Sequence, residues 1–233
     1  MISGYPKFKQ YTEAQMPLAT AVSIGTEVFN TTYQVKMRSN GTSWEWLGVG
    51  RSTWATKPSV APSGQIICIT DVGENGSLWR GNGINWVKLH AVKYYNNTTP
   101  VSLTGTTAET TMLTIPVKGG LIGANGVLAI QPLWSNTNNA NNKTLRIKLG
   151  ATTCYSYGTT NLSHQDAYIN VRNIGSESSQ KTTSGMAGGT GGTVNNYNST
   201  STDTSVDFNI VVTGQLANSA DTMAIQAFLI MVL

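Results

Sequence analysis

Few residues in this chain have the type and spacing that acid–base or metal chemistry requires. The only two histidines, His90 and His164, lie far apart and belong to no His-x-His or His-Glu-x-x-His motif. Zinc sites need several ligands close together, so the sequence predicts no metal site and no cofactor. A phosphate-binding loop and the Gly-x-Ser-x-Gly motif of serine hydrolases are also missing from the sequence.

Paired carboxylates, which glycosidases use, are the remaining route to catalysis. The acidic residues nearest to predicted strands and loops form no recognisable pair in the sequence, although two could meet in space: Glu74, Asp166, Glu177 and Asp207. His164 and Asp166 could form an acid–base pair, but a solvated pair on a loop explains the same spacing. We therefore predict that the chain is not an enzyme, with a polysaccharide-cleaving activity as an alternative.

Aromatic residues are numerous for so neutral a sequence, with six tryptophans and nine tyrosines. Trp and Tyr are enriched at the centres of binding surfaces. Four of them flank polar loops and are the predicted binding residues for a glycan or a protein surface: Trp134, Tyr155, Tyr157 and Tyr197. The alternative for a tryptophan is packing in a core, which is the role predicted for Trp44, Trp46, Trp79 and Trp86.

Uncharged polar residues dominate the composition. Only 11% of the residues are charged, against about 25% in typical soluble domains, and the net charge is +4. Ser, Thr, Asn and Gly make up roughly two-fifths of the chain, which favours strands and turns over helices. Such a surface suits a protein outside a cell or in a rigid assembly and argues against a nucleic-acid partner. The densest basic group, Lys143, Arg146 and Lys148, is either a solvated face or a contact for phosphate or anionic polysaccharide.

The two cysteines, Cys68 and Cys154, are too few for a disulfide framework and are predicted to be small buried hydrophobic residues. The first ten residues lack the apolar segment of a signal peptide. No uncharged apolar span of about 18 residues is present, so we predict no membrane insertion.

Turn signals divide the N-terminal part of the chain. Residues 1–22 contain two X-Pro pairs and are predicted as an extended anchoring arm, with a disordered tail as the alternative. Residues 23–92 are predicted to contain one small β-hairpin module twice, because Asn40-Gly41 and Asn82-Gly83 each precede an aromatic strand. Asn-Gly favours type I′ hairpin turns, in which both central residues need a positive φ. Residues 54–59 would link the two copies.

The C-terminal part is predicted as one β domain. Residues 93–110 are a connector or the first strand of that domain, and residues 111–233 are predicted as a jelly-roll-like β-sandwich. The last strand, residues 223–233, is apolar on both faces, so a second surface must cover the face that does not meet the opposite sheet. We therefore predict contacts with a neighbouring subunit around a symmetry axis, by Phe228, Ile230 and Val232. Cover by the chain's own loops is the alternative.

Two groups of motifs resemble tailed-bacteriophage fibre and appendage proteins. The first is similar to a short module common in phage structural proteins: Pro62-Ser63-Gly64-Gln65, Thr70-Asp71-Val72-Gly73 and Asn82-Gly83-Ile84-Asn85-Trp86. The second covers about half of the chain and is similar to a C-terminal domain of phage tail and head fibre proteins. Its motifs are Thr114-Ile115-Pro116, Asn125-Gly126-Val127-Leu128, the Asn-rich segment 135–144, Asn173, Ser178-Ser179-Gln180, Thr213-Gly214-Gln215 and Asp221-Thr222.

The resemblance implies an all-β chain whose C-terminal domain is a jelly roll in a homotrimer. The sequence has no coiled-coil heptads, so the chain would be a short appendage on a tail, a baseplate or a capsid. Residues 1–92 would then bind other virion proteins, while residues 111–233 would face the host and bind a surface glycan or protein. The chain would lie on the surface of the virion after assembly in the host cytoplasm. The alternative is a decoration protein that stabilises a capsid or tail and binds no host.

Overall fold

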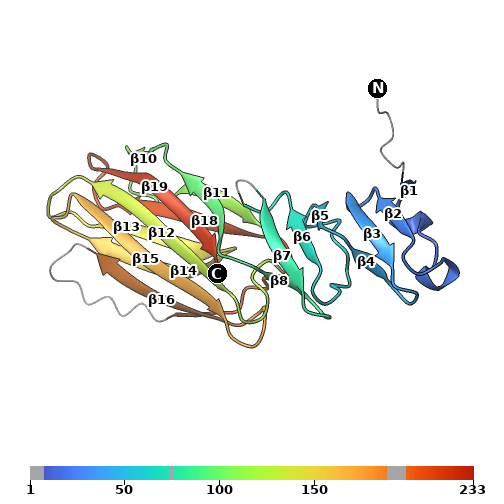
Figure 1. Cartoon of the computed structure of the whole chain (residues 1–233). Helices are drawn as coiled ribbons and strands as arrows, with labels where there is room; N and C mark the ends of the chain where they lie inside the picture. Colours follow the sequence, from blue (N-terminus) through green and yellow to red (C-terminus); the bar gives the residue numbers. More distant parts are fainter. Residues whose placement is uncertain (1–7, 74–75, 188–197) are drawn as a thin grey trace, which may run out of the picture. The chain divides into compact units, whose positions relative to one another are not determined.

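The computed structural model describes residues 8–73, 76–187 and 198–233 of an all-β chain (Figure 1). Contacts divide the chain into two compact units, Met1–His90 (unit 1) and Ala91–Leu233 (unit 2). Residues 93–110, for which the sequence left a connector or a first strand open, contain two strands that pair within unit 2. No helix in the described ranges is long and apolar enough to cross a membrane.

Unit 1 consists of two small sheets with the same topology, which we call module 1 (residues 8–47) and module 2 (residues 49–89). Module 1 contains the strands β1 (Lys9–Tyr11), β2 (Glu27–Asn30), β3 (Val35–Ser39) and β4 (Trp44–Trp46). Module 2 contains the strands β5 (Val49–Ser52), β6 (Ile66–Ile69), β7 (Ser77–Gly81) and β8 (Trp86–Lys88). In each module the first strand pairs parallel to the second, and the other three strands pair antiparallel.

The modules begin earlier than the sequence indicates. Residues 8–22, predicted as part of an extended arm, contain β1 and two short 3-10 helices, η1 (Glu13–Gln15) and η2 (Ala19–Ala21). The predicted linker, residues 54–59, lies at the equivalent place in module 2, between β5 and β6. Both corrections have one cause: a parallel strand pair needs a long crossover connection, which looks like a linker in the sequence.

The Asn-Gly hairpins form as predicted, but with a different turn. Each loop has four residues, and only its glycine has a positive φ, +91° at Gly41 and +95° at Gly83. The asparagine does not adopt the positive φ that a type I′ turn would require. Its side-chain oxygen stabilises the loop instead, because it accepts hydrogen bonds from the backbone amides of two following residues. The Asn40 oxygen is 2.9 and 2.8 Å from the amides of residues 42 and 43, and the Asn82 oxygen is 3.0 and 2.7 Å from those of residues 84 and 85.

Unit 2 is a two-layer β-sandwich with jelly-roll topology. One sheet has the order β10 (Val101–Thr104), β19 (Thr222–Val232), β12 (Val127–Asn136) and β15 (His164–Asn173). The facing sheet has the order β11 (Thr110–Val117), β18 (Phe208–Leu216), β13 (Lys143–Leu149) and β14 (Thr152–Thr159). Numbered one to eight along the chain, these strands form sheets 1-8-3-6 and 2-7-4-5, which is the jelly-roll order. The predicted fold class is confirmed.

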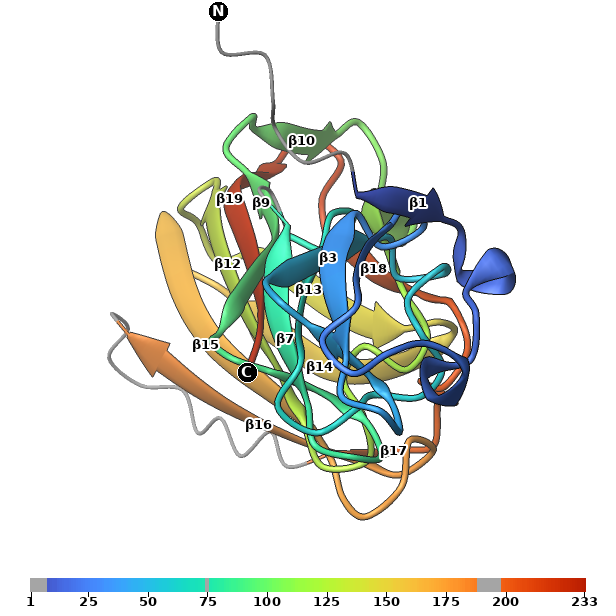
Figure 2. The ribbon, with the colours of Figure 1, turned by 45° about the vertical axis from the view of Figure 1, so that its right-hand side comes forward.

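Three further strands extend the first sheet of unit 2. The strands β16 (Gln180–Ala187) and β17 (Asn198–Thr200) continue it beyond β15, as Figure 2 shows for β16. The strand β9 (Val92–Asn97) pairs with the C-terminal half of β19. β19 therefore has neighbours on both edges, and its main-chain groups are not free to pair with another chain.

The terminal strand is apolar on both faces, but the predicted subunit contacts lie on its inner face. Phe228, Ile230 and Val232 are each 0% exposed, because they pack inside the chain's own sandwich. The outer face of β19 contains the half-buried Leu229 and Met231. A strand apolar on both faces gives no sequence signal for which face turns inward, and this is why the assignment was wrong.

The cysteines differ in their surroundings. Cys154 is buried in β14, and burial raises the pKa of its thiol to about 12. Cys68 in β6 is only half-buried, so the prediction of two buried cysteines is correct for one of them. Both thiols are free.

Candidate functional site

The aromatic residues predicted to bind a ligand do not form a surface site. Trp134 and Tyr155 are each 0% exposed, so neither ring is available at the surface of the chain. Trp134 points into the sandwich because it shares the inward face of β12 with Leu128 and Ile130, and burial raises the pKa of Tyr155. Tyr157 is half-buried and meets the Trp134 ring edge-on at 6.2 Å. Tyr197 lies outside the described residues.

None of the acid–base candidates that the structure describes is buried. His164 and Asp166 are both exposed on β15, and the imidazole Nδ1 is 3.0 Å from the Ser163 hydroxyl. Asp207 is exposed beside Lys118 at 3.7 Å, and Glu74 lies outside the described residues. Within the part of the chain that the structure describes, no three His, Cys, Asp or Glu residues are arranged to hold a metal ion. The absence of an enzymatic activity remains a prediction.

The predicted basic group is divided between the surface and the interior. Arg146 and Lys148 both pair with Glu109, at 3.3 and 2.6 Å. The hydrogen bond from Lys148, followed by that from Thr213, lowers the pKa of Glu109, which keeps the carboxylate ionised between the two cations. Lys143 points inward and is 1% exposed. This face of the sheet therefore contains an acid-neutralised pair rather than a free patch for anions.

Several residues that carry the fibre resemblance form a buried ionic network at one end of the sandwich. The ammonium group of Lys143 donates hydrogen bonds to the Asn139 side-chain oxygen and, at 2.8 Å, to the Asn141 carbonyl. It lies 3.5 Å from a carboxylate oxygen of Asp221, which is itself 3% exposed. The side-chain amides of Asn139 and Asn141 donate to that carboxylate at 2.7 and 3.0 Å. These motif residues satisfy one another.

A second buried network contains Asn173 and Gln180, two further residues of the resemblance. The Asn173 amide donates to the Gly123 carbonyl at 2.7 Å and to the Thr204 hydroxyl at 2.9 Å. Gln180 donates to the Asn173 oxygen at 2.9 Å and accepts a hydrogen bond from Thr200 at 3.0 Å. The network joins β15, β16 and β17 to the loop that precedes β18. The two buried networks therefore hold the jelly roll of unit 2 together.

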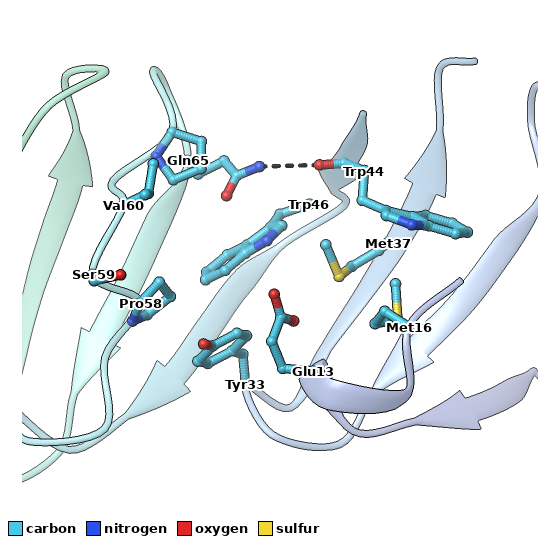
Figure 3. A pocket seen from close by; sticks show the side chains of 11 residues that line it. Glu13, Met16, Tyr33, Met37, Trp44, Trp46, Pro58, Ser59, Val60 and Gln65 are labelled. Carbon is cyan, nitrogen blue, oxygen red and sulfur yellow. Dashed lines mark hydrogen bonds between the residues drawn. The ribbon is translucent and has the colours of Figure 1, made fainter. Parts of the chain in front are cut away.

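An aromatic hollow in unit 1 is the best candidate for a binding site. Its volume is about 380 Å³, within the range of small-ligand pockets. Both modules contribute to it, through η1, β3, β4, the β2–β3 loop and the segment between β5 and β6 (Figure 3). The residues that line it are Glu13, Met16, Tyr33, Met37, Trp44, Trp46, Pro58, Ser59, Val60, Pro62 and Gln65. We call this hollow the aromatic pocket.

The rings of the pocket are fixed by their neighbours. Trp46 stacks on Tyr33 with ring centroids 5.6 Å apart, and its other neighbour, Trp86, is 6.0 Å away. Trp44 is held by its indole N–H, which donates to the Pro17 carbonyl at 2.9 Å. A side chain at Gly50 would place its Cβ 2.2 Å from the Trp46 ring, so glycine is required there. The predicted core role of Trp46 is thus combined with a half-exposed position at the pocket.

Two polar side chains of the pocket, Glu13 and Gln65, offer hydrogen-bond acceptors. The carboxylate of Glu13 accepts a hydrogen bond from Asn30 at 2.6 Å through one oxygen only. The Gln65 amide donates to the Trp44 carbonyl at 3.3 Å, whereas its buried side-chain oxygen accepts no hydrogen bond. Figure 3 shows these two side chains pointing into the hollow from opposite sides. Burial, followed by the charge of Glu13, raises the pKa of Tyr33, so its hydroxyl stays neutral.

The sequence does not predict this site. It indicates a core role for Trp44 and Trp46 and places Glu13 in the extended arm. The doubled Asn-Gly-x-x-Trp motif is the available signal, since the motif tryptophan has the same role in each module: Trp86 donates to the Pro58 carbonyl at 2.8 Å, as Trp44 does to the Pro17 carbonyl.

Comparisons with known proteins add little. No protein family and no curated protein matches the chain. Two solved viral structures resemble it weakly: infectious bursal disease virus Gx strain (10% identity, TM-score 0.25, 86% of this chain and 50% of that chain) and the infectious bursal disease virus VP2 subviral particle (13% identity, TM-score 0.23, 85% and 49%). The chain spans about half the length of these structures, and such scores assign neither a common fold nor a function.

Proposed function

We propose that the chain is a structural component of a phage virion, a short tail or head fibre or a related appendage that adheres to the host surface. The observation that carries the proposal is the agreement between the motifs that resemble fibre proteins and the structure that they build. The Asn-Gly-x-x-Trp motifs form two modules of one topology, and the Asn-rich motifs form the buried networks of a jelly roll. Jelly rolls are common in viral and sugar-binding proteins, which agrees with this role.

In this proposal unit 1 attaches the chain to the particle, and unit 2 projects from it. The aromatic pocket supports an attachment role for unit 1, because half-exposed tryptophan side chains such as Trp44 and Trp46 are typical of the centres of protein interfaces. Unit 2 is then free to meet the host surface, on the exterior of the virion. Adhesion by unit 2 rests on the resemblance alone.

The test of the proposal is made on the phage whose genome encodes the chain. Mass spectrometry of purified particles should detect the chain, and purified chain added to host cells should reduce adsorption of the particles. Presence in the particle without any effect on adsorption would favour the decoration protein over the fibre. Absence from the particle would contradict both.

We further propose that unit 2 associates as a homotrimer through the outer face of β19. Leu229 and Met231 lie on this face, beside Leu133 of β12, which is 38% exposed, and Tyr168 of β15, which is 41% exposed. β19 contains no charged residue over its eleven positions, which suits the centre of a subunit interface.

Light scattering on the purified chain should give three times its mass of 24.9 kDa. Met231→Glu should reduce the mass to that of one chain, because a carboxylate cannot be buried unpaired in an apolar interface. The matched control is Thr114→Glu, which adds the same charge to an exposed position on the opposite sheet and should leave the trimer intact. A monomeric wild-type chain would overturn the proposed trimer in solution.

A further inference from the structure

The aromatic pocket presents acceptors that no described residue satisfies. The buried side-chain oxygen of Gln65 has no hydrogen-bond partner among the described residues, although buried polar atoms in folded proteins are almost always paired. The second carboxylate oxygen of Glu13 accepts no hydrogen bond from the described residues, and none of the residues that line the pocket is Lys, Arg or His. A ligand that complements this pocket must therefore bring N–H or O–H donors, and a positive charge would match Glu13.

The aromatic and sulfur groups around these acceptors narrow the choice of ligand. The electron-rich faces of the half-exposed Trp44 and Trp46 attract cations, and the thioether of the half-exposed Met16 adapts to an apolar stem. A quaternary ammonium would leave the Gln65 oxygen unpaired, because it has no N–H group. A neutral sugar would not match the charge of Glu13, whose side chain is exposed at the rim. A guanidinium group meets the three requirements of the pocket. Its N–H groups can donate to the Gln65 oxygen, its positive charge matches Glu13, and its planar shape fits against an aromatic ring.

We propose that the aromatic pocket binds the guanidinium group of an arginine side chain on a partner protein of the particle. The guanidinium donates hydrogen bonds to Glu13 and Gln65 and lies against the tryptophan rings. This inference rests on the proposed attachment of unit 1 to the virion and names the group that unit 1 recognises there.

The direct test is a titration of the full chain with N-acetylarginine amide, followed by tryptophan fluorescence. The neutral control ligand is N-acetylcitrulline amide, which has the same shape and retains N–H donors but lacks the charge. We expect saturable binding of the arginine compound, at least about tenfold tighter than that of citrulline, because hydrogen bonds between charged groups are the stronger ones. Equal affinity for the two compounds, or no saturable change with either, would overturn the inference.

The variant that tests the assignment is Glu13→Gln. Glutamine can still accept the hydrogen bond from Asn30, so the variant removes the charge and little else. It should bind the arginine compound about tenfold more weakly and lose the preference over citrulline. The matched control is Glu45→Gln on β4, which removes a carboxylate that accepts from Asn40 at 2.9 Å and does not line the pocket. A Glu13→Gln variant that kept wild-type affinity would contradict the proposal.

Binding to particles that lack the chain separates the inference from the proposed function. If wild-type chain binds such particles and Glu13→Gln binds more weakly, both stand. If the two bind equally, the arginine site is wrong while the virion role stands. If neither binds, the virion role fails, and the titration with the two amides still decides what the pocket recognises.

Discussion

Substituting Lys143 by methionine should lower the free energy of unfolding of the chain by about 3 kcal/mol, a decrease of roughly 10 °C in the melting temperature. The ammonium group is buried against Asp221, Asn139 and Asn141. Methionine keeps most of the volume but leaves the carboxylate and two amide oxygens short of a donor. We place the expected cost at the lower end of the range for a broken buried pair, because two asparagine amides still donate to Asp221.

The matched control for this substitution is Lys118→Met. Lys118 pairs with Asp207 at 3.7 Å, but its side chain is 44% exposed, so the change should cost less than about 0.5 kcal/mol. Differential scanning calorimetry of both variants measures the contrast. Equal melting temperatures for the two variants would mean that Lys143 is not part of a buried network.

The same network adds a pH dependence to the stability of the chain. The hydrogen bond from Asn139 lowers the pKa of Asp221, with smaller contributions from Asn141 and Lys143. A carboxyl group whose pKa is lower in the folded state stabilises the fold above its unfolded value, and this contribution is lost as the pH falls through the folded pKa. The unfolded value is about 3.9, so melting temperatures should decrease below about pH 4.

The fold was predictable because its signals are local. The alternation of apolar and polar residues specifies the strands β13 and β18 within a few residues. The Asn-Gly pairs specify turns over an equally short range. The short strands β1 and β5 were missed because three or four residues give no periodicity, and because a parallel partner lies far away in the sequence. The sequence does not decide whether residues 93–110 form a connector or a strand, because both strands in this range pair with β19 at the far end of the chain.

The candidate site was less predictable, because it depends on which side of a strand faces inward. Trp134 flanks a polar loop, yet the pairing of β12 with β15 and β19 turns its ring into the core. Glu13 lies in the short helix η1 and Gln65 in the segment between β5 and β6, 52 positions apart in the sequence, and only the assembly of unit 1 brings them to one hollow. Chemistry formed by such distant residues leaves no spacing pattern in the sequence.

The two faces of β19 should respond differently to truncation, and this is the sharpest test of the corrected subunit contacts. Phe228→Ala should lower the free energy of unfolding by about 3–5 kcal/mol, because the ring is 0% exposed and packs beside Tyr95, with centroids 6.3 Å apart.

The matched control is Leu229→Ala, which truncates the next residue on the outer face. The melting temperature of Leu229→Ala should depend on protein concentration, because this substitution weakens the association of subunits. The decrease in melting temperature caused by Phe228→Ala should be present at every protein concentration. Calorimetry over a range of concentrations, with light scattering on the same samples, separates these effects. A Phe228→Ala chain that dissociated into monomers without loss of monomer stability would place the phenylalanine back in a subunit interface.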